Sequence, residues 1–455
     1  MLRPYSWVPP VTFHSLVIVV SVLTYVLTTR VERERRPPSI AIAWVLGMIA
    51  IPYLALPVYL LFGRRKLQRK VSHWSAVRSR GKHWAEDLIE SFGLAPSAPS
   101  ATRLHRDGSE SADALFSTMA GARERLDICT YILGDDPFGR EAVQYMIQSV
   151  QTGVQVRLLL DGVGAVQVRR ACFREMRDAG IEVAIFSPLL ARKTQGPRNL
   201  RNHRKMVIAD GARLWAGGRN IAAEYFVGLK GVPPWRDLSF DLSGAVAAAA
   251  ASQFEADWVA AGGKPAARRL MPAPEVGGGR AQFLPSGPDQ TEDTVHALLI
   301  DACFHSRERM MAVTPYFVPD VSLETALRLA ARRGVKIDLY VPATSNHVLA
   351  DFARNRALRA LSNAGVTVHL MPFMIHAKAV VFDETLALAG SVNLDSRSLL
   401  LNYECAVVFY GAAEIDWLAN WMASLLPESQ AFDAKAPGLW RDVCEGLLLT
   451  LAYQL

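Results

Sequence analysis

The sequence contains two copies of one pattern, His203-Arg-Lys-Met-Val-Ile-Ala-Asp210 and His376-Ala-Lys-Ala-Val-Val-Phe-Asp383, each with the spacing His-x-Lys-x-x-x-x-Asp. Each copy continues to an Asn seventeen residues after its His, Asn220 and Asn393, with a Gly three positions before that Asn. A single copy would be a weak motif. Two copies with matched spacing and flanks indicate an internal repeat that carries chemistry.

The apolar residues after each Lys predict a buried strand, 206–209 in the first copy and 379–382 in the second. On a strand, residues two apart share a face, so each His lies on the same face as its Lys. Turns at Asp210 and Asp383 lead into second apolar strands, 214–216 and 386–389, and this hairpin returns the Asn beside its own His. Each copy therefore offers an imidazole, an ammonium and a carboxamide, which suit an oxyanion with several acceptor oxygens.

A chain of 455 residues has room for two globular domains or two halves of one large domain. The net charge of +7 is unevenly placed, because a basic cluster between Arg64 and Lys82 contains no acid. Its position beside an apolar segment favours lipid headgroups over nucleic acid, and a solvated linker is the alternative. The five cysteines form no C-x-x-C pair, so we interpret them as buried side chains in a reducing compartment.

Two apolar runs near the start, Val11 to Leu27 and Ser39 to Phe62, predict membrane helices at about 11–28 and 39–62, within an anchor spanning 1–70. A signal peptide is the alternative for the first run. Pro52 and Pro57 leave a kink or a shallow re-entrant dip open for the second. The larger basic cluster follows the second run, which favours a multi-pass protein of the cytoplasmic membrane with a cytosolic catalytic part.

After a basic linker at 71–108, an α/β pattern runs through 109–262 and again through 281–455, with a linker at 263–280. The repeat includes Ala122-Arg-Glu-Arg125 and Ser306-Arg-Glu-Arg309, each followed by an apolar strand. Strands that alternate with helices predict a largely parallel sheet covered on both faces. We expect two α/β/α halves that pair about a pseudo-two-fold axis. The first half carries an extra basic loop at 187–201, for which contact with an acidic headgroup and simple solvation both stay open.

These residues resemble the phospholipase D superfamily, whose signature is two such motifs at one active site, and within it the bacterial cardiolipin synthases. The narrower likeness rests on the N-terminal apolar hairpin, on four further segments and on Glu404. The segments are Trp235-Arg-Asp237, Pro285-Ser-Gly-Pro-Asp289, Thr314-Pro-Tyr-Phe-Val-Pro319 and Gly390-Ser-Val-Asn-Leu-Asp-Ser-Arg-Ser398. Two departures bear on substrate choice at the first motif: Ala222-Ala223 replaces a frequent Gly-Asp, and Gly218-Arg219 stands where the other half has Ser391-Val392.

The resemblance implies a phosphohistidine mechanism without metal or other cofactor. It assigns His203 as the nucleophile and His376 as the general acid and then base. The histidines also lack a second ligand at metal-binding spacing. The remaining expected site residues are Lys205, Lys378, Asn220, Asn393 and Ser391 around the phosphoryl oxygens, Asp237 and Glu404 as orienting carboxylates, and Asp210 and Asp383 with the catalytic motifs. For Ser391 the alternative is closure of the Gly-Ser turn, and for the motif aspartates it is capping of the hairpin.

The implied activity joins two phosphatidylglycerol molecules into cardiolipin and releases glycerol. The alternatives are a phospholipase D-type hydrolase, and a transphosphatidylase that uses another acceptor or phosphatidylethanolamine. A nuclease is disfavoured because a membrane hairpin restricts access to nucleic acid. A catalytically silent lipid-binding scaffold is disfavoured because both motifs are intact. The expected partners are phospholipids and the membrane, and no protein partner is indicated.

Overall fold

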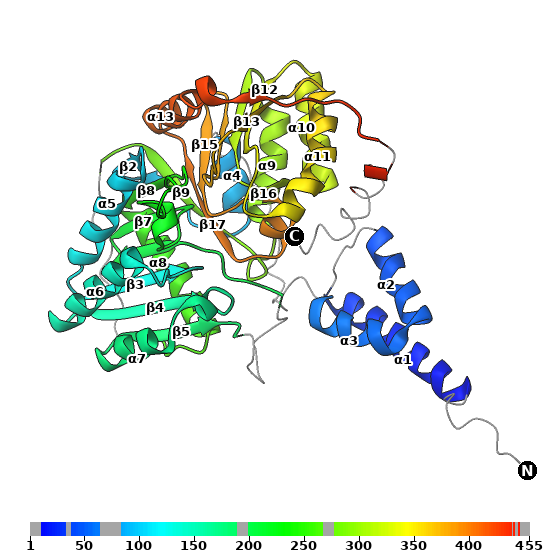
Figure 1. Cartoon of the computed structure of the whole chain (residues 1–455), viewed down its shortest axis with the longest axis horizontal. Helices are drawn as coiled ribbons and strands as arrows, with labels where there is room; N and C mark the ends of the chain where they lie inside the picture. Colours follow the sequence, from blue (N-terminus) through cyan, green and yellow to red (C-terminus); the bar gives the residue numbers. More distant parts are fainter. Residues whose placement is uncertain are drawn as a thin grey trace, which may run out of the picture.

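The computed structural model describes residues 11–32, 38–63, 83–188, 199–266 and 277–438, together with residues 440, 441 and 445. Most of the predicted basic segments, at 33–37, 64–82 and 189–198, lie outside these described residues. Figure 1 shows two α/β halves that lie against each other, with a group of N-terminal helices drawn in blue to one side.

The first half is built on a seven-stranded sheet with the order β2-β8-β7-β6-β3-β4-β5. A helix lies in each crossover connection between strands, and another helix follows the last strand. The elements in chain order are β2 (Thr102–His105), α5 (Gly108–Ala120), β3 (Arg125–Thr130), α6 (Pro137–Gln151), β4 (Gln155–Asp161), α7 (Arg170–Asp178), β5 (Glu182–Phe186), β6 (Met206–Ala209), β7 (Arg213–Gly217), β8 (Ser239–Ser243) and α8 (Ala245–Ala260).

The second half repeats this order as β9-β17-β15-β14-β10-β12-β13 and adds β1 (Ala98–Pro99) and β18 (Gln430–Ala431) at the two edges. The repeat explains why both motifs take the same local structure. The elements are β9 (Arg280–Ser286), α9 (Thr294–His305), β10 (Arg309–Val313), β11 (Phe317–Val318), α10 (Val321–Arg332), β12 (Lys336–Pro342), α11 (Val348–Ser362), β13 (Thr367–Met371), β14 (Ala379–Phe382), β15 (Leu386–Gly390), β16 (Leu394–Asp395), α12 (Ser396–Leu400), β17 (Glu404–Phe409) and α13 (Ala412–Ala423).

Both sheets are mixed, so the prediction of a largely parallel sheet was wrong. Within these two sheets, the described strands pair in parallel only at β3-β4-β5 and β10-β12-β13, where helices supply the crossovers. The hairpins β6-β7 and β14-β15 and the strands beside them pair antiparallel. For the two hairpins the reason is the length of the connection, because a turn of a few residues can join only antiparallel neighbours.

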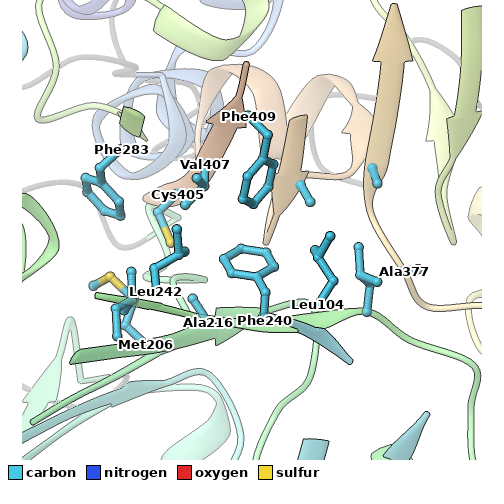
Figure 2. Close-up of a cluster of buried hydrophobic side chains, with 14 of the residues drawn as sticks. Leu104, Met206, Ala216, Phe240, Leu242, Phe283, Ala377, Cys405, Val407 and Phe409 are labelled. Carbon is cyan, nitrogen blue, oxygen red and sulfur yellow. The ribbon is translucent and has the colours of Figure 1, made fainter. Parts of the chain in front are cut away.

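The two sheets face each other across a shared apolar core, shown in Figure 2. Phe240 of β8 meets Phe409 of β17 edge to face, with ring centroids 5.5 Å apart. On β17, Val407 and Phe409 belong to this shared core, whereas Ala406 and Val408 belong to the separate core of the second half. This period of two is the burial pattern of a strand covered on both faces.

The segment before the first half is attached to the second half. Helix α4 (Trp84–Ser91) packs on α9, and Glu86 forms an ion pair with Arg280 at 2.8 Å. Strand β1 pairs antiparallel with β9. The described part of the expected basic linker therefore contains α4, β1 and β2, and it ties the two halves together.

The N-terminal region forms three helices that pack on one another: α1 (Val11–Glu32), α2 (Pro38–Ala50) and α3 (Pro52–Phe62). The second apolar run does not form one helix, because it is interrupted at Ile51, ahead of Pro52. Among the described residues, no helix has both the length and the hydropathy that a membrane crossing requires. The expectation of two membrane-spanning helices, and with it the multi-pass assignment, is therefore not supported. The break at Pro52 agrees with the kink that the sequence left open.

Candidate active site

Each motif histidine lies just before the first strand of its hairpin, where its backbone contacts the other half. The backbone N–H of His203 donates to the carbonyl of Tyr403, 2.8 Å away. In the symmetric contact, the N–H of His376 donates to the carbonyl of Arg236, 2.6 Å away. Tyr403 and Arg236 are the residues immediately before Glu404 and Asp237. The backbone thus brings the motif of each half to the acid of the other half.

The side chains make the same crossed contacts between the two halves. His203 Nδ1 lies 3.0 Å from Glu404 Oε1, and His376 Nδ1 lies 2.6 Å from Asp237 Oδ2. Both carboxylates are fully buried. A carboxylate at Nδ1 fixes the ring orientation and leaves Nε2 for chemistry. At His376, Lys378 Nζ lies 3.1 Å from that Nε2. Both acids were predicted as orienting partners from the sequence, but no local pattern indicated that each one serves the histidine of the opposite half.

Two glycines allow the acids to approach. A Cβ on Gly217 would lie 2.3 Å from the carbonyl oxygen of Leu238, and a Cβ on Gly390 would lie 2.3 Å from that of Cys405. Both contacts are far below van der Waals distance, so a side chain would push β8 or β17 away. The glycine found three residues before each Asn is therefore required for the close packing of the strand that presents the acid.

Ser391 contacts the orienting acid rather than an open space. Its Oγ lies 2.5 Å from Glu404 Oε2 and accepts a hydrogen bond from the backbone N–H of Cys405 at 3.0 Å. The equivalent position in the first half is Gly218, where a Cβ would lie 2.2 Å from Asp237 Oδ1. The longer Glu404 thus has a hydroxyl partner and the shorter Asp237 has none at this position. This geometry supports a positioning role for Ser391, and direct phosphate contact stays a prediction.

The acids remain ionised in this setting. Burial alone would raise the pKa of Asp237, but His376 and Lys378 hold it at about 2. Burial likewise opposes ionisation of Glu404, yet His203 lowers its pKa below the usual value. Two buried carboxylates therefore balance the positive charge of the motif lysines.

The pKa values of the motif lysines and histidines are lowered, mainly because these groups are buried. The pKa falls to about 8 for Lys205 and about 7 for Lys378. Burial and the nearby Lys378 lower the pKa of His376 to about 3, and burial lowers that of His203. The charge of each lysine also lowers the pKa of the histidine in the other half. Both motifs therefore lie in one electrostatic field. Without substrate both histidines are therefore neutral, and an arriving phosphate diester would restore positive charge.

Comparison with known proteins shows the family. The family model described as "Cardiolipin synthase, PLD-like domain" matches residues 115–258 and 299–426, one match in each half. The chain belongs to the phospholipase D superfamily, with a cardiolipin synthase-like domain. It is an enzyme of the phosphatidyltransferase type. A second model, described as phospholipase D-nuclease N-terminal, matches residues 15–64.

The relatives of this cardiolipin synthase-like chain match over most of their length. Cardiolipin synthase A of Pseudomonas aeruginosa is 29% identical, and the match covers 93% of this chain and 92% of the relative. Cardiolipin synthase 1 of Bacillus cereus is 29% identical, with 83% and 81% covered. The crystal structure of phosphatidylserine synthase from Haemophilus influenzae has the same fold, with a TM-score of 0.64 at 12% identity over 82% of this chain and all of that one.

The motif asparagines of this cardiolipin synthase-like enzyme are already engaged within the protein. Asn220 Nδ2 donates to the Tyr225 hydroxyl at 2.8 Å, and Asn220 Oδ1 accepts from the N–H of Ile132. Asn393 Nδ2 donates to Ser398 Oγ at 3.2 Å. Tyr225 in turn packs edge-on against His376, with centroids 5.0 Å apart. The asparagines therefore shape the walls of the site, and their contact with phosphate stays a prediction.

The motif aspartates lie at the opposite ends of their strands from the histidines. The Asp210 carboxylate accepts hydrogen bonds from the backbone N–H groups of residues 123–125, and Asp383 does the same for residues 307–309. Both aspartates have positive φ, 55° and 49°. The two Arg-Glu-Arg repeats are the segments that they hold. This geometry supports the alternative that the aspartates cap the hairpin, and it places neither of them at the reacting atoms.

We predict that Asp210→Ala destabilises the protein by about 2–3 kcal/mol, because three N–H groups lose their acceptor and Ala tolerates positive φ poorly. Asp210→Asn keeps one acceptor oxygen and should lose less. Thermal unfolding measures both variants. A catalytic rate that falls sharply while the unfolding temperature stays unchanged would contradict the capping role.

A buried ionic network beside His203 escaped the sequence analysis. Arg204, within the first motif, is fully buried and pairs with Asp257 and Asp289. Its Nε also donates to the carbonyl of Glu404, 2.9 Å away. A second basic residue beside Lys205, just before the apolar strand β6, was the available signal. Its partners are distant in sequence, so nothing pointed to them.

Proposed function

We propose that this enzyme transfers a phosphatidyl group between two phosphatidylglycerol molecules, forming cardiolipin and releasing glycerol. The observation that carries the proposal is the reciprocal pairing of each histidine with the acid of the opposite half. Two oriented imidazoles and two lysines in one buried field suit attack on a phosphodiester. The curated relatives named cardiolipin synthase support this choice of reaction.

In the proposed reaction, His203 Nε2 attacks phosphorus and the bond from phosphorus to the glycerol headgroup breaks. His376, which takes up a proton when the anionic diester binds, supplies that proton to the departing glycerol. It then accepts a proton from the hydroxyl of the second phosphatidylglycerol, whose oxygen displaces His203 from phosphorus. Lys205 and Lys378 stabilise the non-bridging oxygens throughout. His203 suits the nucleophilic role because its side chain is 15% exposed, against 5% for His376.

The N-terminal helices support contact with the lipid surface. Many of their apolar side chains are exposed, among them Phe13, Leu23 and Leu54. Exposed apolar residues in such number are typical of a membrane-contacting surface. The match of residues 15–64 to the phospholipase D-nuclease N-terminal model also supports membrane association. We propose that these helices hold the enzyme at the cytosolic surface of the membrane.

Product analysis tests the proposed reaction. Purified enzyme with headgroup-labelled phosphatidylglycerol in vesicles should yield cardiolipin and free glycerol in equal amounts. Phosphatidic acid as the sole lipid product would identify a hydrolase instead. Supplying phosphatidylethanolamine in place of either lipid shows which donor and which acceptor the site accepts.

We predict a bell-shaped dependence of kcat/KM on pH in the free enzyme. The acid limb should lie below pH 6.5, because the pKa of His203 is lowered from that value and the nucleophile must be neutral. Activity should fall again above about pH 7, as Lys378 and then Lys205, with pKa values of about 7 and about 8, lose their charge. A profile that stays flat from pH 6 to pH 10 would contradict the role of the lysines.

A further inference from the structure

The two flanks of the site are not equivalent, although the halves repeat. On the Glu404 flank, Arg204 fills the space between the halves and binds Asp257 of α8. On the Asp237 flank, the same positions in the repeat hold Ala377 and Ser424. Ala377 is buried in the shared core, and the small side chain of Ser424 lies at the wall of an open space. The structure has a cleft of about 670 Å³ there, within the size range of small-molecule sites.

The cleft has a cationic end beside the catalytic pair. Arg219 and Asp237 both line it, and Arg219 is only 1% exposed. The guanidinium donates from Nε to the carbonyl of Tyr225 and from Nη1 to Ser239 Oγ. Within the described residues, no hydrogen bond occupies its Nη2. Burial lowers the pKa of Arg219 only to about 10, so the group stays charged at neutral pH.

The rest of the wall is aromatic. Trp235, Trp417 and Trp421 line the cleft, and Trp235 also lies against His376, with ring centroids 5.5 Å apart. Arg106 and Arg236 add positive charge at exposed positions of the wall, each with a glutamate partner. A buried cation next to indole rings suits an amphiphile whose anionic end is small and whose remainder is apolar.

We propose that this cleft binds an anionic phospholipid as a second lipid site, with its phosphate on Arg219 and its glycerol and first chain carbons against the tryptophans. The bound lipid would not react, because the cleft is lined by Asp237, which contacts Nδ1 of His376, whereas the proposed reaction uses the histidine Nε2 atoms. The proposal rests on the phospholipid chemistry of the proposed function. It goes beyond that function by assigning a site outside the reacting centre, on one flank only.

The test uses a photoactivatable phosphatidylglycerol in vesicles and the full-length His203→Asn variant, which cannot consume the probe. Peptide mapping should find the probe on residues 412–425, which comprise α13 and the two residues after it. Arg219→Gln and Asn420→Trp should each reduce this labelling at least five-fold, the first by removing the cation and the second by filling the cleft from an exposed position. Asp416→Trp, exposed on the same helix outside the cleft, is the matched control and should not reduce it.

Because the readout is labelling, it is independent of which product the enzyme makes. Equal labelling in all variants would overturn the proposal. So would equal labelling by a phosphatidylcholine probe, because the site would then not select an anion. Displacement of the lipid probe by millimolar inorganic phosphate would also overturn the proposal, because the cleft would then be a site for free phosphate. Asn420→Trp keeps the test decisive if Arg219→Gln fails to fold.

Discussion

Replacing either motif histidine with Asn is expected to lower kcat by at least about 10⁴-fold, because one variant loses the nucleophile and the other loses the proton donor and acceptor. The double variant should be no slower than the slower single variant, since both groups act on one phosphorus atom. Steady-state cardiolipin formation in vesicles measures all three.

His305→Asn is the matched control for these variants. This histidine is exposed and stacks on Trp84, far along the chain from either motif. It should retain near wild-type activity. A histidine-motif variant that keeps more than a few per cent of the activity would contradict the assignment of both imidazoles to the reaction.

The second large effect is expected at the orienting acids, because each one fixes the tautomer of a histidine from the other half. Glu404→Gln and Asp237→Asn should each reduce kcat by about 10²–10⁴-fold, the range seen when a carboxylate behind a catalytic histidine is neutralised. Activity alone cannot show which histidine each acid serves. Nuclear magnetic resonance of ring-labelled histidine can, because Nδ1 and Nε2 shifts report the tautomer.

The crossed arrangement gives a specific pattern of shifts. Glu404→Gln should change the ring shifts of His203, and Asp237→Asn those of His376. Ser391→Ala should change His203 in the same direction as Glu404→Gln but less, because Ser391 contacts that carboxylate. If each acid instead perturbed the histidine of its own half, the crossed site would be wrong.

Much of the site could be predicted from local patterns. The motif spacing indicated two hairpins, and the structure has them as β6-β7 and β14-β15. The positions of Asp237 and Glu404, just before the next strand, marked them as partners. These inferences worked because they depend on strand periodicity and turn residues, which act over short distances in the chain.

The remainder depends on how the halves dock. Three features join residues that are far apart in sequence. They are the contact of each histidine with the acid of the other half, the pairing of Arg204 with Asp257 and Asp289, and the cleft beside Asp237. Hydropathy likewise described 39–62 as one apolar run, whereas the break at Ile51 follows from the missing N–H of Pro52 and its fixed φ. The mixed sheets were missed because helix-strand alternation was weighted over the short hairpin turns.

The central claim is that both halves form one centre in which His203 becomes covalently attached to phosphorus. A donor with a nitrophenyl leaving group needs no proton for departure, so His376→Asn should still form the intermediate and then stall. This account predicts a burst of one nitrophenol per chain with His376→Asn, a matching phosphatidyl mass increase on the intact protein, and neither with His203→Asn. A burst with His203→Asn but not with His376→Asn would reverse the roles, and no covalent adduct in either variant would contradict the account.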